Sequence, residues 1–299
     1  MELRYGNIWH VLHPLKWSVY DRDAEYNEQQ IISSGVPKQT LHGIKWNAVE
    51  NEELMKHPMK RERILGIVQP GRIGDIIIVL PIAKWYYDEG YKVIWPVCEE
   101  FIPLFDYVNY VEPFKIPGKV ATSSYSMSIT ALRSIGVDHI IDLGIGFGKD
   151  ETNWISSKLH FNEWKYKEAN VPFKERFNLQ INRDLRKEYE LWQFVKQQNN
   201  LNGDNYSVIH DEGTKGPFKF DKKGVRIFPA QGYTVFDWIG IMEKAKHLYC
   251  VDSCISNLAD QLKICVGRRT IWFWKDIPDK EPRKTLGFPR LCKDWEVIE

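Results

Sequence analysis

The stretch "ILGIVQPGRIGDIIIVLPIAKWYYDEG" (Ile64–Gly90) decides the fold. It opens with an apolar run, "ILGIVQ", which lacks polar alternation and is typical of a strand buried on both faces of a parallel sheet. A turn with Gly71 and Gly74 follows, and apolar residues then recur at helical spacing as far as the final glycine. Pro81 is expected to kink this helix or to mark a restart. The stretch therefore predicts a strand, a tight turn and a helix, the repeating unit of a parallel α/β domain.

The same alternation continues toward the C-terminus. An amphipathic helix in "RDLRKEYELWQFVKQQNN" and the turn signal "LNGDN" divide the predicted strands into two series. The first series after Gly90 covers residues 92–97, 109–114 and 138–144, and the second covers 206–210, 224–228, 248–252 and 270–275. Two such series predict an α/β protein with two Rossmann-like domains, whose parallel sheets face each other across a cleft.

The dividing helix and turn also suggest the domain limits. We expect an N-terminal domain over residues 61–185 and a C-terminal domain over residues 186–299. Residues 1–60 are rich in Trp, Tyr and His and finish in a charged stretch. This part belongs to neither series of predicted strands and is interpreted as an irregular N-terminal extension.

Composition and charge exclude several classes of protein. Apolar residues make up 43% and charged residues 27% of the 299-residue chain, which is ordinary for a folded protein. The formal net charge of +1 gives no general attraction to nucleic acid or membrane. No apolar run reaches the roughly 18 residues of a membrane span, and no signal peptide is recognised, so a cytoplasmic protein is expected. The five cysteines contain no C-x-x-C pair, which favours reduced thiols and predicts no metal site.

The turn "PGRIGD" is the first candidate for ligand binding. Gly71 and Gly74 would let the backbone approach a ligand closely, and the helix that follows would present N–H groups at its start. The turn matches neither the Walker loop nor G-x-G-x-x-G. It also carries a carboxylate, Asp75, which the helix N-terminus would help to keep ionised.

The turn in "VDSCISNLA" is the second candidate. Ser253 is a plausible N-cap for the next helix, and the N–H groups of that helix suit a phosphate or a diphosphate. Asp252, at the strand end, would be repelled by a diphosphate and more plausibly accepts hydrogen bonds from sugar hydroxyls. Capping of the helix is the alternative role for Asp252.

Together these two turns resemble those of the heptosyltransferase-like glycosyltransferases of family 9. Residues 64–97 are similar to that family's strand with its "SLGD…LP" turn, and residues 236–264 are similar to its "DSG..H" stretch. "HIIDLG" and "VPFKERFNL" also fall where the family has comparable segments. The resemblance covers about residues 62–290 and implies the GT-B fold of two Rossmann-like domains.

The resemblance also implies roles for individual residues. It makes Asp75 the general base that deprotonates the acceptor hydroxyl, although capping of its helix is an alternative role. It implies an inverting transfer without a bound metal or cofactor, in which the nucleoside-diphosphate sugar is a co-substrate. The donor site would be formed by Asp252, Ser253, Cys254, Asn257, Lys215 and Lys219, and the acceptor or phosphate loops by Gly71, Arg72, Gly74, Gly144 and Gly146. For the basic residues a solvated surface position is the alternative.

The chain departs from the family in three places. Cys254 and Asn257 stand where the family usually has Gly and His, so part of the donor pocket is expected to differ. The interval from His210 to Gly224 is short, which suggests that the second domain lacks a helix-strand unit. The first 60 residues have no counterpart.

Several functions remain open at this point. The acceptor is a glycan, a lipid-linked molecule or a hydroxymethylated base in DNA, since viral DNA glucosyltransferases share the fold. In the last case the basic clusters "KHPMKRER", "KKGVR" and "KEPRK" would track the phosphates. A peripheral contact with a membrane or with DNA is compatible with the absence of a membrane span. The fold is also compatible with a sugar-nucleotide epimerase, or with a protein that binds a nucleotide sugar without turnover.

Overall fold

The computed structural model describes residues 2–5, 8–13, 16–21, 62–145, 151–201, 205–213, 216–265, 267–273 and 289–298. The chain forms two units, Met1–Glu62 and Arg63–Glu299. In the first unit, three antiparallel strands are paired in the order β1-β2-β3, and their bounds are Glu2–Tyr5, Ile8–His13 and Lys16–Asp21. The prediction of an irregular segment was therefore wrong for these residues. The Gly–Asn pair between the first two strands is a hairpin signal that favours this pairing.

The first sheet of the second unit has four parallel strands in the order β6-β5-β4-β7. Helices or a 3-10 helix connect successive strands, as the alternating sequence pattern predicts. In chain order the elements are β4 (Arg63–Val68), α4 (Ile73–Asp88), β5 (Tyr91–Cys98), η1 (Glu99–Tyr107), β6 (Glu112–Ile116), α5 (Thr122–Ile135) and β7 (His139–Asp142).

Helix α4 is buried on every side. Nine consecutive residues, from Ile76 to Lys84, are buried, because the helix packs against β5, η2 (Phe173–Phe177) and a helix of the second sheet, α10 (Cys254–Gln261). α4 also runs through Pro81 without ending, so the predicted restart does not occur. Burial of the residues on both sides of Pro81 offsets the hydrogen bond that proline cannot donate.

The second sheet has five parallel strands in the order β11-β8-β12-β13-β14. Its last strand was not predicted, because "WEVI" is short and shows no alternation. The strands are β8 (Ser207–His210), β11 (Val225–Arg226), β12 (His247–Val251), β13 (Arg269–Trp272) and β14 (Trp295–Ile298), and the helices besides α10 are α8 (Leu185–Gln198), η3 (Val235–Trp238) and α9 (Ile239–Lys244).

The connection between β8 and β11 contains no helix among its described residues. It forms a small antiparallel ribbon, β9 (Glu212–Gly213) with β10 (Gly216–Pro217). Phe218 and Phe220 then pack on the sheet, where Phe218 stacks on Trp272 at a centroid distance of 4.1 Å. Two aromatic side chains therefore take the place of the helix that the short interval lacks.

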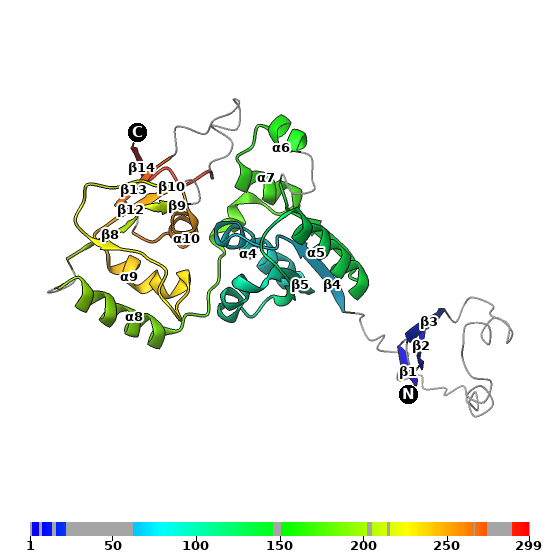
Figure 1. The fold of residues 1–299 in the computed structure, drawn as a ribbon. Coiled ribbons are helices and arrows are strands. Elements are labelled where there is room, and N and C mark those ends of the chain that lie inside the picture. The colour runs from blue at the N-terminus through cyan, green and yellow to red at the C-terminus, as the bar shows by residue number, and fades with distance from the viewer. Residues whose placement is uncertain are drawn as a thin grey trace. The chain divides into compact units, whose positions relative to one another are not determined.

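The two sheets lie on either side of one continuous core. In Figure 1, α4 and α10 run side by side between them. Helices α6 (Glu151–Ser157) and α7 (Phe161–Glu168) precede η2 in the segment that leads from the first sheet to α8. The boundary predicted at residue 185 falls at the start of α8, which packs against η3 and α9 of the second sheet. Among the described residues, no helix combines the length and the apolar character that a membrane span requires.

Candidate functional site

The two predicted turns meet in the structure. A Cβ atom built on Gly74, in the first turn of α4, would lie 3.6 Å from both the Cα and the backbone nitrogen of Cys254, the first residue of α10. The start of α4 and the start of α10 therefore lie close together, with room for about one methyl group at Gly74. The predicted gap does not exist at this point, so a substrate would have to lie beside the contact and not between the two turns.

Neither glycine of the first turn adopts a positive φ, and only Gly71 is required by packing. A Cβ on Gly71 would lie 2.2 Å from Cγ2 of Val120 and 2.5 Å from Cε2 of Phe101, so only glycine fits there. The left-handed conformation instead falls on Arg72, the N-cap of α4, with φ 61° and ψ 124°. A side chain in this region is strained, and such strain is concentrated at functional sites.

Asp75 is anchored by a buried cation that the sequence interpretation missed. Nζ of Lys165, on α7, lies 3.2 Å from Oδ1 of Asp75, and the exposed fractions of the two side chains are 3% and 24%. Burial lowers the pKa of Lys165, whereas Asp75 and then Asp142 act in the opposite direction. Sequence alone offers no signal for this residue, because Lys167 on the same helix has the same charge and is exposed.

A buried amide and a buried phenol complete the surroundings of Lys165. Gln69, just after β4, accepts a hydrogen bond from Lys165 Nζ (2.6 Å) and donates from Nε2 to the hydroxyl of Tyr125 (3.1 Å). Burial, and then the charge of Asp75, raise the pKa of Tyr125 above its ordinary value. A Cβ on Gly144 would lie 2.3 Å from the Tyr125 ring, so this glycine is required for the position of the phenol. Gly144 thus contributes to the site indirectly, because it leaves room for the Tyr125 ring.

On the second sheet, the end of β8 and the start of α10 are joined by a hydrogen bond. Nδ1 of His210 lies 2.9 Å from Oγ of Ser253, which holds the predicted N-cap position. The backbone N–H of Ser253 donates to Oγ of Ser256 (3.0 Å). Burial lowers the pKa of His210 to about 4, so its imidazole is neutral at pH 7. His210 is a further residue that the sequence interpretation did not assign to the site.

Cys254 and Asn257 lie at the contact between the two helices. Burial raises the pKa of the Cys254 thiol to about 11, so it is a neutral thiol and not a thiolate. Nδ2 of Asn257 donates to the backbone carbonyl of Ser253 (2.9 Å) and lies 3.8 Å from the Cβ position of Gly74. The backbone of Cys254 and the side chain of Asn257 thus lie next to the first turn of α4.

The remaining predicted residues are more dispersed. Asp252 is half-buried at the end of β12, and its backbone N–H donates to the carbonyl of Trp272 (3.2 Å). Lys219 is exposed in the loop after β10. Lys215 and Gly146 lie outside the described residues. Among the residues that are described, no group of three or more His, Cys, Asp or Glu side chains is arranged to hold a metal ion.

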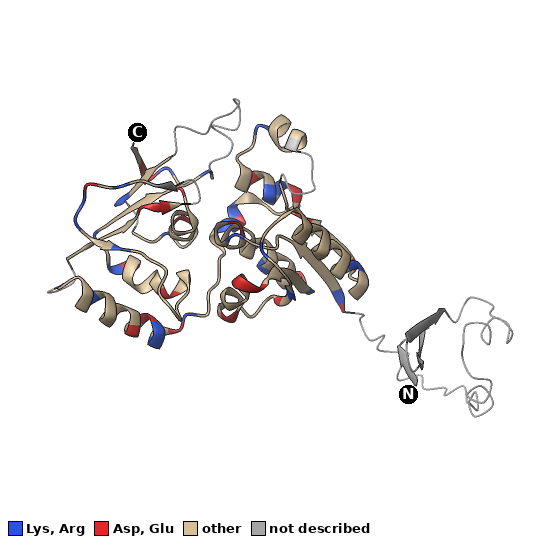
Figure 2. Cartoon of the chain, in the orientation of Figure 1, with Lys and Arg blue, Asp and Glu red and all other residues tan. Residues whose placement is uncertain are grey.

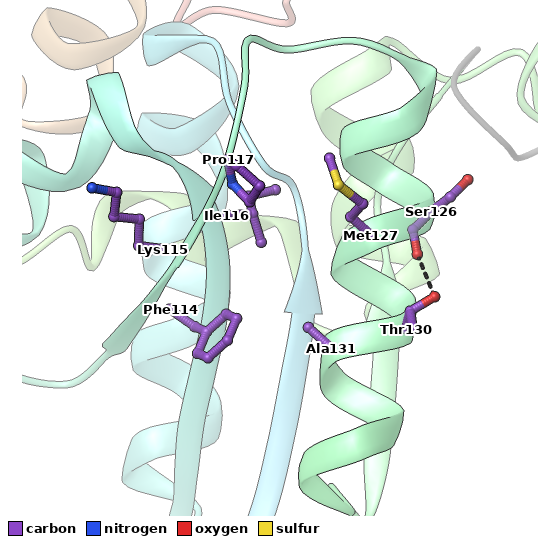
Figure 3. Close-up of a pocket in the computed structure, with 8 residues that line it drawn as sticks. All are labelled: Phe114, Lys115, Ile116, Pro117, Ser126, Met127, Thr130 and Ala131. Carbon is purple, nitrogen blue, oxygen red and sulfur yellow. Dashed lines mark hydrogen bonds between the residues drawn. The ribbon is translucent and has the colours of Figure 1, made fainter.

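A shallow apolar groove lies elsewhere on the first sheet. It is formed between the edge strand β6 and helix α5, with a volume of about 450 Å³ (Figure 3). Met127 on α5 faces Ile116 and Pro117 across it, and Thr130 donates a hydrogen bond to the carbonyl of Ser126 on the same helix. Its lining contains no residue of the two turns, so this groove is separate from the candidate site.

The distribution of charge does not single out a nucleic-acid surface. Figure 2 shows Lys and Arg interspersed with Asp and Glu over the second unit. Within the cluster "KKGVR", Arg226 pairs with Asp211 (3.2 Å) and Lys222 lies over the ring of Tyr249. "KEPRK" and almost all of "KHPMKRER" lie outside the described residues. The described cluster is thus engaged in contacts within the protein.

Comparison with known proteins finds similar structures at low identity. No protein-family profile matches the chain, and no curated protein matches it. The family 9 glycosyl transferase of Veillonella parvula has a TM-score of 0.48 and 10% identity, over 72% of this chain and 80% of that one. The E. coli ADP-heptose lps heptosyltransferase II has a TM-score of 0.46 and 11% identity, over 79% of this chain and 90% of that one. E. coli heptosyltransferase WaaC with ADP has a TM-score of 0.42 and 16% identity, over 79% of this chain and 92% of that one.

Proposed function

We propose that the protein is a glycosyltransferase, which transfers a sugar from a nucleotide-activated donor to an acceptor hydroxyl. One observation carries the proposal. Asp75, a partly exposed carboxylate anchored by a buried lysine, directly follows Gly74, where the start of α4 comes close to the start of α10. A base from the first sheet and the N–H groups of a helix from the second sheet thus adjoin the same region. The N–H groups at such a helix start favour the binding of a diphosphate.

The proposed reaction is a single displacement. Asp75 accepts the proton of the acceptor hydroxyl, and the acceptor oxygen forms a bond to the anomeric carbon of the donor sugar. The bond from that carbon to the diphosphate oxygen breaks, and its electron pair leaves with the diphosphate. Attack from the face opposite the leaving group inverts the anomeric carbon.

Donor binding is assigned to the second sheet and to the strained turn. The first N–H groups of α10 would bind the diphosphate, and Asp252 would accept hydrogen bonds from sugar or ribose hydroxyls. Arg72 and Lys219 are the described cations proposed to neutralise the departing charge, without a metal ion. The strained backbone of Arg72 supports its choice over Lys219, because strain is retained where a side chain must be held in place.

Replacement of Asp75 tests the proposal. Donors are first found by thermal stabilisation in a panel of nucleoside-diphosphate sugars that includes ADP-heptose, since a bound ligand raises the apparent stability. Release of nucleoside diphosphate is then measured with glycan, lipid-linked and hydroxymethylated-DNA acceptors. Asp75→Asn should lower kcat by about 100-fold or more and leave donor binding within threefold. Asp88→Asn, at the other end of α4, is the matched control.

Two outcomes contradict the proposal. Near-full turnover by Asp75→Asn would remove Asp75 as the base. A wild-type protein that binds donors but releases no nucleoside diphosphate with any acceptor would be a binding protein and not an enzyme. Turnover of the donor sugar without any acceptor, to a sugar of changed configuration, would instead identify an epimerase.

A further inference from the structure

Lys165 uses all of its hydrogen-bonding capacity inside the protein. Its ammonium group contacts three oxygen atoms, namely Oε1 of Gln69 (2.6 Å), the carbonyl oxygen of Leu143 (2.8 Å) and Oδ1 of Asp75 (3.2 Å). An ammonium group has three protons, and only 3% of this side chain is exposed. Lys165 therefore has no donor left for a substrate, and any effect on the reaction has to act through Asp75.

The surroundings of Lys165 hold it in one place. Gln69 is itself fixed, because its Nε2 donates to the carbonyl of Gly71 (2.9 Å) and to the hydroxyl of Tyr125 (3.1 Å). Leu143 follows β7, whose last residue, Asp142, adds a second negative charge near the ammonium. A buried cation with these partners is a rigid anchor for the carboxylate that it contacts.

The ion pair distinguishes the two oxygen atoms of Asp75. Oδ1 is the oxygen in the 3.2 Å ion pair with Lys165, whereas Oδ2 makes no hydrogen bond with any described residue. The Asp75 side chain keeps 24% of its surface exposed. Oδ2 is therefore the oxygen that can reach an acceptor hydroxyl.

We propose that Lys165 is the positioning residue of the general base, which binds Oδ1 of Asp75 and thereby aims Oδ2 at the acceptor hydroxyl. This inference rests on the proposed function. During the reaction the acceptor proton passes to Oδ2, and Lys165 keeps its three protons throughout. Loss of the cation would leave the carboxylate free to rotate.

The experiment compares Lys165→Met with Lys167→Met, which removes the same charge from the exposed face of the same helix. Each variant is assayed for nucleoside-diphosphate release across pH 5 to 9 with the donor and acceptor that the wild-type protein uses. Lys165→Met should lower kcat by about 100-fold, as expected when a reacting group is displaced by about 1 Å, and leave the KM for the donor within threefold. Lys167→Met should match the wild-type protein in both kcat and the KM for the donor.

A double variant separates positioning from a general loss of structure. If Lys165 acts through Asp75, Asp75→Asn/Lys165→Met should be no slower than Asp75→Asn alone. Lys165→Gln, which keeps N–H donors but lacks the charge, repeats the comparison of kcat and KM should Lys165→Met fold poorly. A wild-type kcat in the charge-removal variants, or an equal slowing by Lys165→Met in both backgrounds, would overturn the inference. Absence of turnover in the wild-type protein would instead overturn the proposed function, and the role of Lys165 with it.

Discussion

Nδ1 of His210 lies 2.9 Å from Oγ of Ser253, so the last residue of β8 is hydrogen-bonded to the N-cap residue of α10. The imidazole is half-buried beside the helix start that is proposed to bind a diphosphate. A neutral ring suits this position, because burial of a charged one is costly.

This burial predicts a loss of stability in acid. The pKa of His210 is lowered from 6.5 to about 4, so protonation favours the unfolded chain. The stabilising effect is fully present above pH 6.5 and is lost as the pH falls through about 4. Between pH 7 and pH 5 this one group should remove about 2 kcal/mol of unfolding free energy. Urea unfolding of the wild-type protein and of His210→Gln at both pH values measures the difference. An equal loss in both proteins would contradict the prediction.

The two glycines of the first turn should respond in opposite directions to alanine. Gly71→Ala places a methyl group 2.2 Å from Val120 and should destabilise the fold by about 1–3 kcal/mol through overpacking. Gly74→Ala meets the backbone of Cys254 at an ordinary 3.6 Å and lies in the first turn of α4, where alanine is favoured by up to about 1 kcal/mol. Urea denaturation midpoints of the two variants test this. Similar midpoints in the two variants would contradict the expected difference.

Strain at Arg72 can be measured with two truncations. Arg72→Ala and Arg72→Gly both remove the guanidinium group, but only glycine adopts φ 61° without strain. Arg72→Gly should therefore be more stable than Arg72→Ala by about 1 kcal/mol, the reverse of the usual preference in ordered backbone. Both should bind a nucleoside-diphosphate sugar more weakly than Arg72→Lys, which keeps the charge. Equal donor affinity in all three variants would remove Arg72 from the donor site.

A buried ion pair joins η2 to α10. Nη1 of Arg176 lies 2.8 Å from Oδ2 of Asp260, and both side chains are almost fully buried. Arg176→Met should cost about 3 kcal/mol of unfolding free energy, because Asp260 then keeps a buried charge with Arg269 as its nearest cation, at 4.0 Å. Arg176→Met/Asp260→Asn should recover part of this loss. Unfolding of the wild-type protein, the single variant and the double variant in guanidinium chloride tests the expectation. A double variant less stable than Arg176→Met would contradict it.

The alternation of apolar strands and helices could be interpreted from local sequence. "ILGIV" has no polar residue to place on a solvent face, so burial on both faces follows directly. The strands beyond this pattern were harder to predict. "WEVI" becomes β14 only because β13 offers it an edge to pair with, and Phe218 replaces a helix only because Trp272 lies beneath it.

The candidate site was predictable only where a turn marks it. Asp75 and Ser253 each follow a strand, and the carboxyl ends of parallel strands are where ligands collect. Lys165 and Lys167 carry the same charge two residues apart, and helix packing alone buries the first and exposes the second. His210 is likewise an ordinary strand-end residue until Ser253 is placed beside it.

The sequence by itself therefore determined the two strand-helix series and the turns that hold Asp75 and Ser253, because the pattern of apolar residues and glycines acts over a few neighbouring positions. Only the tertiary structure decided which turn touches which, where the strained backbone falls and which lysine anchors the carboxylate. Those properties depend on burial and on contacts between residues far apart in the chain. Burial changes the free energy of a charge far more than any local preference does.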